Sequence, residues 1–181
     1  MLKDTPTCDF GAPAPHFVLP DAQGRMHDLN DHMTVKGVLI AFICNHCPYV
    51  KSIADRLAQD AQALMADGIG VLAIMSNDYD SYPADAPDKM VAFAAQHAFP
   101  FPYLVDKDQT VARAYGAVCT PDFFGFSPDG LLQYRGRLDD VAMGDAPSRT
   151  PELLNAMRHI AATGAGPQDQ VPSIGCSIKW R

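Results

Sequence analysis

The sequence predicts an α/β fold in a single domain, and three features of its pattern carry that prediction. Two apolar runs of strand length, 37–43 and 69–75, flank a segment in which apolar residues recur every three or four positions. That order is typical of two parallel strands joined by a crossover helix. A hairpin and another amphipathic segment follow them. Because 181 residues suffice for one sizeable core, we expect a single domain over 1–181.

The first element lies in an N-terminal extension, which we place at 1–35 because this part is rich in Pro, Asp and Gly. Within it, short apolar pieces at 17–19 and 26–29 flank a glycine and predict a β-hairpin. The run GVLIAFI at 37–43 then has no polar position. Such a run is typical of a strand that is buried on both faces.

A long helix and a second buried strand complete the crossover unit. Apolar residues repeat at helical spacing from Pro48 onwards, and Gly68 is a typical helix stop. The strand at 69–75 leads into a polar loop. An inserted helix over 87–97 and a short strand at 101–105 follow this loop.

The last third of the chain predicts two helices and a hairpin. A short helix begins at Asp108, its expected N-cap, and the hairpin turns at 127–130 with the sequence SPDG. The final helix begins after Thr150, which we expect to be its N-cap. The tail at 165–181 shows no clear element, and we expect it to pack on the domain.

Composition and charge exclude several classes of function. Hydrophobic residues make up 48% of the chain, which favours a folded core over disorder. The net charge is −7, from 14 basic and 21 acidic residues, and no basic run is present. We therefore expect neither nucleic acid nor a membrane as a partner. No apolar run is long enough to span a bilayer and no secretory leader is visible, so we expect a cytoplasmic protein.

The cysteines carry the strongest chemical signal. There are five of them, Cys8, Cys44, Cys47, Cys119 and Cys176. An odd number at irregular spacing is not typical of a secreted disulfide framework. In a reducing compartment, a close pair more often indicates redox catalysis or metal binding.

The motif CNHC contains that close pair, at a junction between strand and helix. Cys44 ends a buried strand and Cys47 lies in the first turn of the next helix. Because free N–H groups and the helix dipole stabilise a thiolate there, we expect Cys44 to have a lowered pKa and to be the nucleophile. Cys47 would then resolve the mixed disulfide. The imidazole of His46 would favour the thiolate and make the pair more oxidising.

The same pair allows other interpretations. Two buried cysteines can lie close together by chance. A zinc or copper site would need further ligands, and no second CxxC or HxxxH motif is present, so we expect no metal and no organic cofactor. A thiol peroxidase and a non-enzymatic redox sensor also use such cysteines.

Longer stretches of the sequence resemble a known family. These are CNHC between a strand and a long helix, GAVCTPDFF before a hairpin, and the tail PSIGCSIKW. In this order they resemble the thioredoxin-fold superfamily, and more closely the alkyl hydroperoxide reductase/thiol-specific antioxidant (AhpC/TSA) family. The resemblance covers nearly the whole chain. It implies a thioredoxin-like three-layer α/β/α fold with a central mixed sheet, an N-terminal β-hairpin extension and an inserted helix and strand.

The resemblance also implies roles for single residues. Pro121 matches the cis-proline that faces the redox pair, and the backbone of Thr120 would dock extended substrate segments beside Cys44. Asn45 and Cys119 would support the site. The implied partners are protein or small-molecule disulfides and thiols, together with a dithiol reductant.

The family pattern is incomplete at the positions that peroxiredoxins use for peroxide reduction. Peroxiredoxins carry Thr or Ser three residues before the peroxide-reacting cysteine, and Pro four residues before that. Aligned on Cys47, those positions hold Cys44 and Ile40. Arg137 is a candidate for the activating arginine of the family. We therefore predict a thiol–disulfide oxidoreductase, with an antioxidant peroxidase that uses Cys47 as the alternative and a redox sensor as a second alternative.

Several polar groups outside the motif have open roles. Cys119 is a third redox thiol or a small buried residue. Cys176 packs, forms a disulfide with Cys119 or Cys8, or acts as a resolving thiol. Asn77 and Asp78 follow the second buried strand, where α/β folds place ligand-binding loops.

Overall fold

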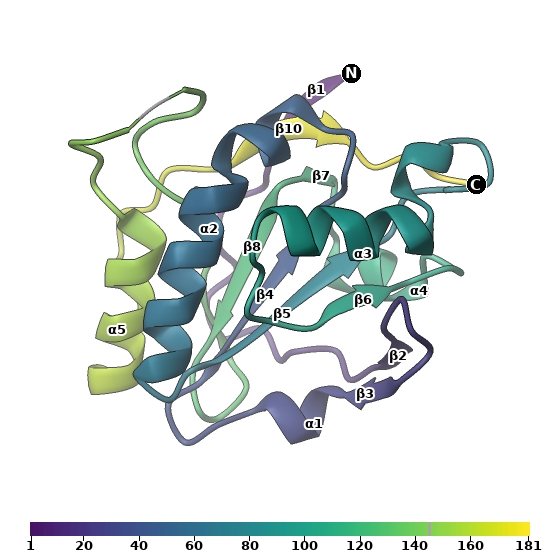
Figure 1. Cartoon of the computed structure of the whole chain (residues 1–181). Helices are drawn as coiled ribbons and strands as arrows, with labels where there is room; N and C mark the ends of the chain where they lie inside the picture. The colour runs from purple at the N-terminus through teal and green to yellow at the C-terminus, as the bar shows by residue number, and fades with distance from the viewer. Residues whose placement is uncertain (145) are drawn as a thin grey trace.

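A five-stranded mixed sheet forms the centre of the molecule, as the computed structural model of residues 1–144 and 146–181 shows (Figure 1). The strands lie in the order β6 (Tyr103–Val105), β5 (Gly70–Met75), β4 (Val38–Phe42), β8 (Asp122–Phe126) and β9 (Leu132–Tyr134). The central strand β4 is parallel to β5 and antiparallel to β8. All five residues of β4 are buried, as the unbroken apolar run predicts.

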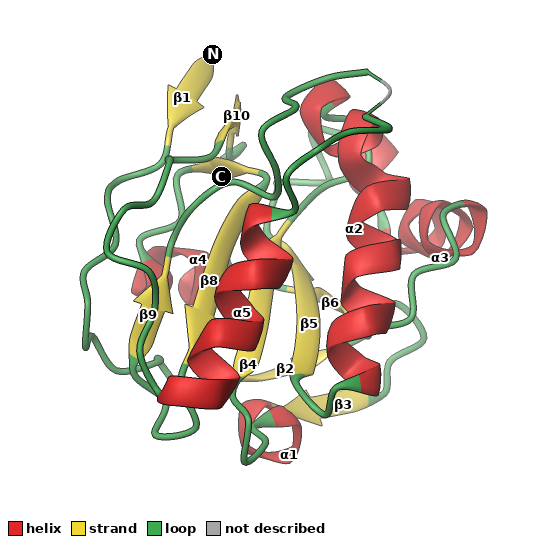
Figure 2. Ribbon diagram, turned by 90° about the vertical axis from the view of Figure 1, so that its left-hand side faces the viewer, coloured by secondary structure: helices red, strands yellow, loops and turns green. Residues whose placement is uncertain are grey.

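Helices cover both faces of this sheet (Figures 1 and 2). One face packs against α2 (Pro48–Ala66), α3 (Pro87–Gln96) and α5 (Glu152–Thr163). The other face packs against α1 (Leu29–His32), α4 (Thr110–Tyr115) and part of the N-terminal segment. Alternate residues of β4 divide between the two cores, with Leu39 in the first and Ile40 in the second. The three-layer α/β/α arrangement agrees with the prediction.

The N-terminal hairpin and the inserted elements are also present. β2 (Val18–Pro20) pairs in an antiparallel manner with β3 (Met26–Asp28). The insertion between β5 and α4 supplies α3 and the edge strand β6. β6 pairs parallel to β5, which extends the sheet beyond the crossover unit.

A second, three-stranded sheet lies over one end of the central sheet. Its order is β1 (Leu2–Asp4), β10 (Ile174–Ser177) and β7 (Cys119–Thr120), and both pairings are antiparallel. The tail therefore forms a strand where the sequence showed no clear element. The partners of β10 lie at distant points of the chain, so no local sequence pattern indicates the pairing.

Two predicted helix caps are wrong. The N-cap position of α4 is held by Gln109, in the left-handed conformation, and not by Asp108. The first N–H groups of that helix donate instead to the buried carboxylate of Asp106, at the end of β6. The N-cap position of α5 is held by Pro151 and not by Thr150.

Candidate active site

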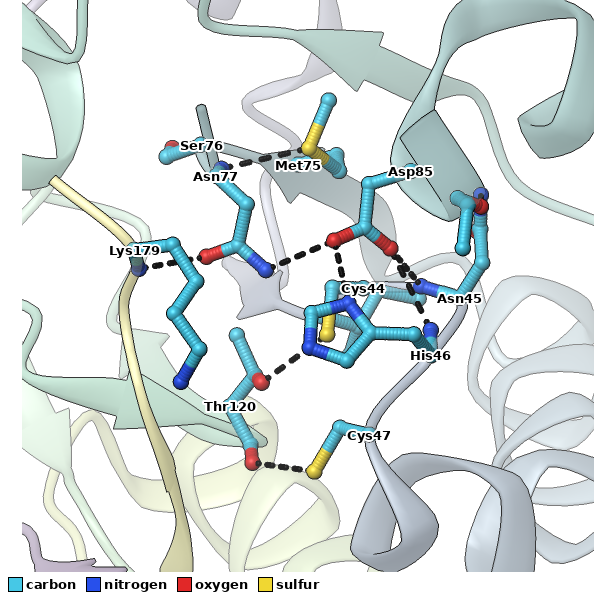
Figure 3. Close-up of polar contacts among 12 residues, drawn as sticks. Cys44, Asn45, His46, Cys47, Met75, Ser76, Asn77, Asp85, Thr120 and Lys179 are labelled. Carbon is cyan, nitrogen blue, oxygen red and sulfur yellow. Dashed lines mark hydrogen bonds and ion pairs between the residues drawn. The ribbon is translucent and has the colours of Figure 1, made fainter. Parts of the chain in front are cut away.

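The two cysteines of the CNHC motif lie where the central strand passes into the longest helix (Figure 3). Both are buried, with exposed fractions of 1% for Cys44 and 0% for Cys47. The helix α2 begins at Pro48, and Cys47 is its N-cap. Proline suits the first helical position because its missing N–H would have no partner there. Cys47, and not Cys44, therefore lies where the free N–H groups of the helix converge.

The predicted lowering of the Cys44 pKa is wrong, because Cys47 holds that position. The pKa of Cys47 is lowered to about 4 by a hydrogen bond from the thiol of Cys44 and by the backbone N–H of Val50. The pKa of Cys44 is raised well above its ordinary value by its hydrogen bond to Cys47, by burial and by the nearby Asp85 carboxylate. The lowered pKa that was expected of Cys44 is therefore that of Cys47.

Thr120 and Pro121 face this pair, as the family resemblance implies. The Thr120–Pro121 peptide bond is cis. The hydroxyl of Thr120 lies 3.2 Å from the sulfur of Cys44, and its carbonyl oxygen lies 3.2 Å from the sulfur of Cys47. A protonated Cys47 donates to that carbonyl, whereas a Cys47 thiolate has no proton to donate and would accept a hydrogen bond from the thiol of Cys44. Thr120 thus contacts both sulfurs of the pair.

A buried carboxylate that the sequence analysis missed holds the motif in place. Asp85 ends a 3₁₀-helix, η1 (Pro83–Asp85), and is fully buried. It accepts hydrogen bonds from the backbone N–H groups of Asn45 (2.8 Å) and His46 (3.2 Å) and from the side chain of Asn77 (2.9 Å). Burial raises the pKa of Asp85, but the bonds from His46, Asn77 and Asn45 outweigh it and the pKa is lowered. The loop after β5 was expected to be polar, but its composition does not reveal which carboxylate turns inward.

His46 contacts this carboxylate directly. Its Nδ1 atom lies 2.5 Å from Oδ2 of Asp85, and its ring stacks on Tyr82 with centroids 5.8 Å apart. The negative charge of Asp85 opposes the effect that was expected of the imidazole on Cys44. That His46 sets the redox potential stays a prediction.

Asn45 ties the motif to two neighbouring elements. Its Oδ1 atom accepts a hydrogen bond from the hydroxyl of Tyr103 at 3.0 Å, and its Nδ2 donates to the carbonyl of Ala84 at 3.0 Å. Tyr103 lies on β6 and is buried. The conformation of the CNHC loop is therefore fixed by bonds to both the sheet and η1.

Cys44, His46 and Asp85 also form a set that could hold a metal ion. One donor atom from each lies within 4.8 Å of the others. Structural zinc sites take four ligands, and the carboxylate here already bonds two backbone N–H groups and the imidazole. A hydrogen-bond network accounts for the arrangement.

The remaining two cysteines near the site lie on opposite faces of the β7–β10 pair. Cys176 is directly opposite Thr120, and such partners place their side chains on the same face. Because Thr120 contacts Cys44, Cys176 also faces the dithiol. Cys119, the next residue along β7, faces the other way, and burial raises its pKa to about 12. Its surroundings fit the interpretation of Cys119 as a small buried residue.

Strand β10 occupies the backbone edge that was expected to dock substrate. Cys176 pairs with Thr120, and Ser177 pairs with Cys119. The hydroxyl of Ser173 donates to the carbonyl of Pro121 at 2.9 Å. An extended substrate segment can reach Thr120 only if it takes the place of β10.

Comparison with known proteins gives relatives of two kinds. The model of the AhpC/TSA family matches residues 10–135. A Mycobacterium tuberculosis protein provisionally named a peroxiredoxin is 25% identical over 154 residues, which are 85% of this chain and 87% of that protein. The thiol–disulfide oxidoreductase ResA of Geobacillus thermodenitrificans is 28% identical over 123 residues, 68% of this chain and 66% of ResA.

Solved structures share the fold. An uncharacterized conserved protein from Geobacillus kaustophilus has a TM-score of 0.93 and 40% identity, over 100% of this chain and 97% of its own. The thioredoxin domain of a thiol–disulfide oxidoreductase from Bacteroides vulgatus has a TM-score of 0.63 and 18% identity, over 84% of this chain and 97% of its own. The predicted thioredoxin-like fold is confirmed.

Proposed function

The chain belongs to the AhpC/TSA family and is an oxidoreductase of the thiol–disulfide class, and we propose that Cys44 and Cys47 are its redox couple. One observation carries this proposal: both thiols are buried at the start of α2, where Cys44 lowers the pKa of Cys47 and Cys47 raises the pKa of Cys44, so that Cys47 is the thiolate and Cys44 keeps its proton. A thiolate, and not a thiol, attacks a disulfide. Cys47 is therefore the attacking group and Cys44 the resolving one.

The reaction proceeds in two exchanges. The Cys47 thiolate attacks a substrate disulfide, so that a mixed disulfide forms and one substrate sulfur leaves as a thiolate. In the mixed disulfide Cys47 carries no negative charge, so it no longer raises the pKa of Cys44. Cys44 then attacks the sulfur of Cys47, and its proton goes to the second departing substrate thiol. The substrate gains two electrons and the protein ends with a Cys44–Cys47 disulfide, which a dithiol reductant restores.

Reduction of insulin disulfides with dithiothreitol as the electron donor tests this mechanism. We expect Cys47→Ser to abolish turnover. Cys44→Ser loses the resolving thiol but keeps a hydroxyl donor beside Cys47, so it should slow turnover by about tenfold or more without abolishing it. Cys8→Ser, which removes a half-buried thiol outside the site, is the matched control. Full activity of Cys47→Ser would refute the proposal. Metal analysis of the purified protein checks the Cys44, His46 and Asp85 set in the same preparation.

Peroxide reduction is the second candidate function, and the same thiolate favours it. Cys47 would attack the O–O bond, become a sulfenic acid and release water; Cys44 would then condense with it to the disulfide and a second water. The guanidinium of Arg137, however, donates two hydrogen bonds to Glu152, at 2.8 and 2.7 Å. Hydrogen peroxide consumption that depends on Cys47, at a rate above that of insulin reduction, would support an antioxidant role.

The partners and location follow as proposals from the same chemistry. We propose protein or small-molecule disulfides and thiols as substrates and a dithiol protein as reductant, with no nucleic acid or membrane partner. A cytoplasmic location is supported by the odd, irregularly spaced set of cysteines. Among the residues that the structure describes, no helix combines the length and the apolar character needed to cross a bilayer. Cell fractionation with rapid thiol trapping tests the location.

A further inference from the structure

We propose that Cys176, on the C-terminal strand β10, is a third redox thiol that forms a disulfide with Cys47. The proposal rests on the thiol–disulfide chemistry proposed above and adds a second resolving residue to the same site. It gives the tail of the chain a chemical role in addition to its packing role.

The pairing register aims Cys176 at the pair. Cys176 lies directly opposite Thr120 in the antiparallel β7–β10 ladder. The hydroxyl of Thr120 contacts Cys44, and its carbonyl contacts Cys47. Since directly opposed residues share a face of the ladder, the side chain of Cys176 points at the same two sulfurs. Cys176 packs against the buried cluster that contains Cys44 and Cys47, and its presence helps to lower the pKa of Cys47.

Bonds on both sides of Cys176 hold β10 in this position. On its N-terminal side, the hydroxyl of Ser173 donates to the carbonyl of Pro121. On its C-terminal side, the backbone N–H of Lys179 donates to the side chain of Asn77 at 2.9 Å (Figure 3). β1 pairs with the other edge of β10, with Leu2 opposite Cys176. The third sulfur is therefore part of an ordered strand and not of a loose tail.

Exposure distinguishes Cys176 from the other three cysteines near the site. Cys44 and Cys47 have almost no exposed surface, whereas Cys176 is half-buried. Cys119 faces away from the pair and is fully buried. Of these four cysteines, Cys176 is thus the one with surface exposed to solvent, on the side from which an external dithiol would approach.

The proposed step balances without a further reagent. A substrate disulfide reaches Cys47 when β10 lifts, because Cys47 has no exposed surface of its own. When the strand returns, Cys176 attacks the sulfur of Cys47 in the mixed disulfide. The Cys47–Cys176 bond forms, the bond to the substrate breaks, and the substrate leaves as a thiol with the proton of Cys176. The two cysteines lose two electrons and the substrate disulfide has gained them; an external dithiol then reduces Cys176 and Cys47.

The test uses the Cys44→Ser variant, in which Cys47 has lost its neighbour. Diamide oxidation, alkylation of free thiols and mass-spectrometric mapping should show a Cys47–Cys176 disulfide. With glutathione disulfide, we expect the adduct on Cys47 to decay about tenfold faster or more in Cys44→Ser than in Cys44→Ser/Cys176→Ser. Cys44→Ser/Cys8→Ser is the matched control and should behave as Cys44→Ser.

Two results would overturn the inference. One is a link from Cys47 to Cys119 in place of Cys176; the other is an adduct that decays equally fast with and without Cys176. A different result would refute the proposed function: a wild-type protein that does not reduce insulin. If that protein still formed the Cys47–Cys176 link with diamide, the placement of the third thiol would be supported and its catalytic use refuted.

Discussion

Asp85 and His46 form the contact on which the geometry of the site depends: Oδ2 of the buried carboxylate lies 2.5 Å from Nδ1 of the imidazole. The same carboxylate accepts the backbone N–H groups of Asn45 and His46. Asn77 donates to it as well, and the carbonyl oxygen of the Asn77 side chain accepts the backbone N–H of Lys179. One carboxylate therefore connects the loop between the cysteines with the C-terminal tail.

Replacement of this carboxylate should change both the chemistry and the stability. Asp85→Asn removes a negative charge that raises the pKa of Cys44. In a Cys47→Ser background, we expect the pKa of Cys44 to fall, with alkylation at fixed pH about tenfold faster for each unit. Asparagine also turns an N–H₂ group towards other donors, which should cost about 1–3 kcal/mol of unfolding free energy. Iodoacetamide kinetics and urea unfolding measure the two effects.

The pH dependence of that stability has a definite sign. The pKa of Asp85 is lowered in the folded protein, so its stabilising contribution is present above the unfolded pKa and is lost as the pH falls through the folded pKa. The difference in unfolding free energy between wild type and Asp85→Asn should shrink on acidification below about pH 4. A difference that stays constant down to the folded pKa would show that the charge of Asp85 does not contribute.

The proton shared by the two cysteines should determine how the redox potential varies with pH. Above about pH 4, Cys47 is ionised and Cys44 keeps its proton, so reduction takes up one proton for two electrons. The potential should fall by about 30 mV per pH unit, half the value for a couple that takes up two protons. Equilibration with glutathione buffers measures this slope.

Absorbance of the thiolate near 240 nm supplies the control for this prediction. The signal should titrate near pH 4 in wild type and disappear in Cys47→Ser. A slope of about 60 mV per pH unit would instead place a proton on both sulfurs and contradict the thiolate at Cys47.

A tyrosine beneath the motif offers a prediction about stability alone. The hydroxyl of Tyr103 donates to the side chain of Asn45, and burial raises the pKa of this phenol well above its ordinary value. Tyr103→Phe leaves a buried acceptor without its donor, which should lower the unfolding free energy by about 1–3 kcal/mol. Because the phenol is neutral, the titration of Cys47 should stay unchanged. A displaced titration would mean that Tyr103 positions the thiolate.

Local patterns in the sequence account for the fold elements and for the dithiol, but not for its electrostatics. The unbroken apolar run of β4 and the helical spacing after Pro48 are each contained in one segment, so periodicity reveals them. The same proline marks where α2 begins, and its preference for the first helical position is the signal that places Cys47 at the cap. The sequence analysis placed Cys47 in the first turn of the helix but assigned the lowered pKa to Cys44.

Long-range contacts account for what the sequence did not show. Asp85 is one of several acidic residues in a polar loop, and only the folded chain brings it beneath the backbone of Asn45 and His46. β10 has its partners near the first residue of the chain and at Thr120. Neither contact leaves a periodic signal, because each joins segments that are far apart in the sequence.

Gly175 provides a test of whether β10 covers Cys47 in the active site. A Cβ atom at this position would lie 2.0 Å from the carbonyl oxygen of Thr120 and 3.0 Å from the nitrogen of Pro121. Because both neighbours are backbone atoms, Gly175→Ala should push β10 away from β7, at a cost of about 1–3 kcal/mol. We expect Cys47 to become open to alkylation and the yield of the Cys47–Cys176 link to fall.

Alkylation kinetics followed by peptide mapping measure the opening. Ser177→Ala, on the same strand, is the matched control and should leave the kinetics near wild type. Cys47 has no exposed surface while β10 is in place, so its alkylation rate reports how often the strand lifts. If Gly175→Ala lost stability but Cys47 stayed unreactive, a group other than β10 would cover the thiolate, and substrate would have to reach it without displacement of the tail.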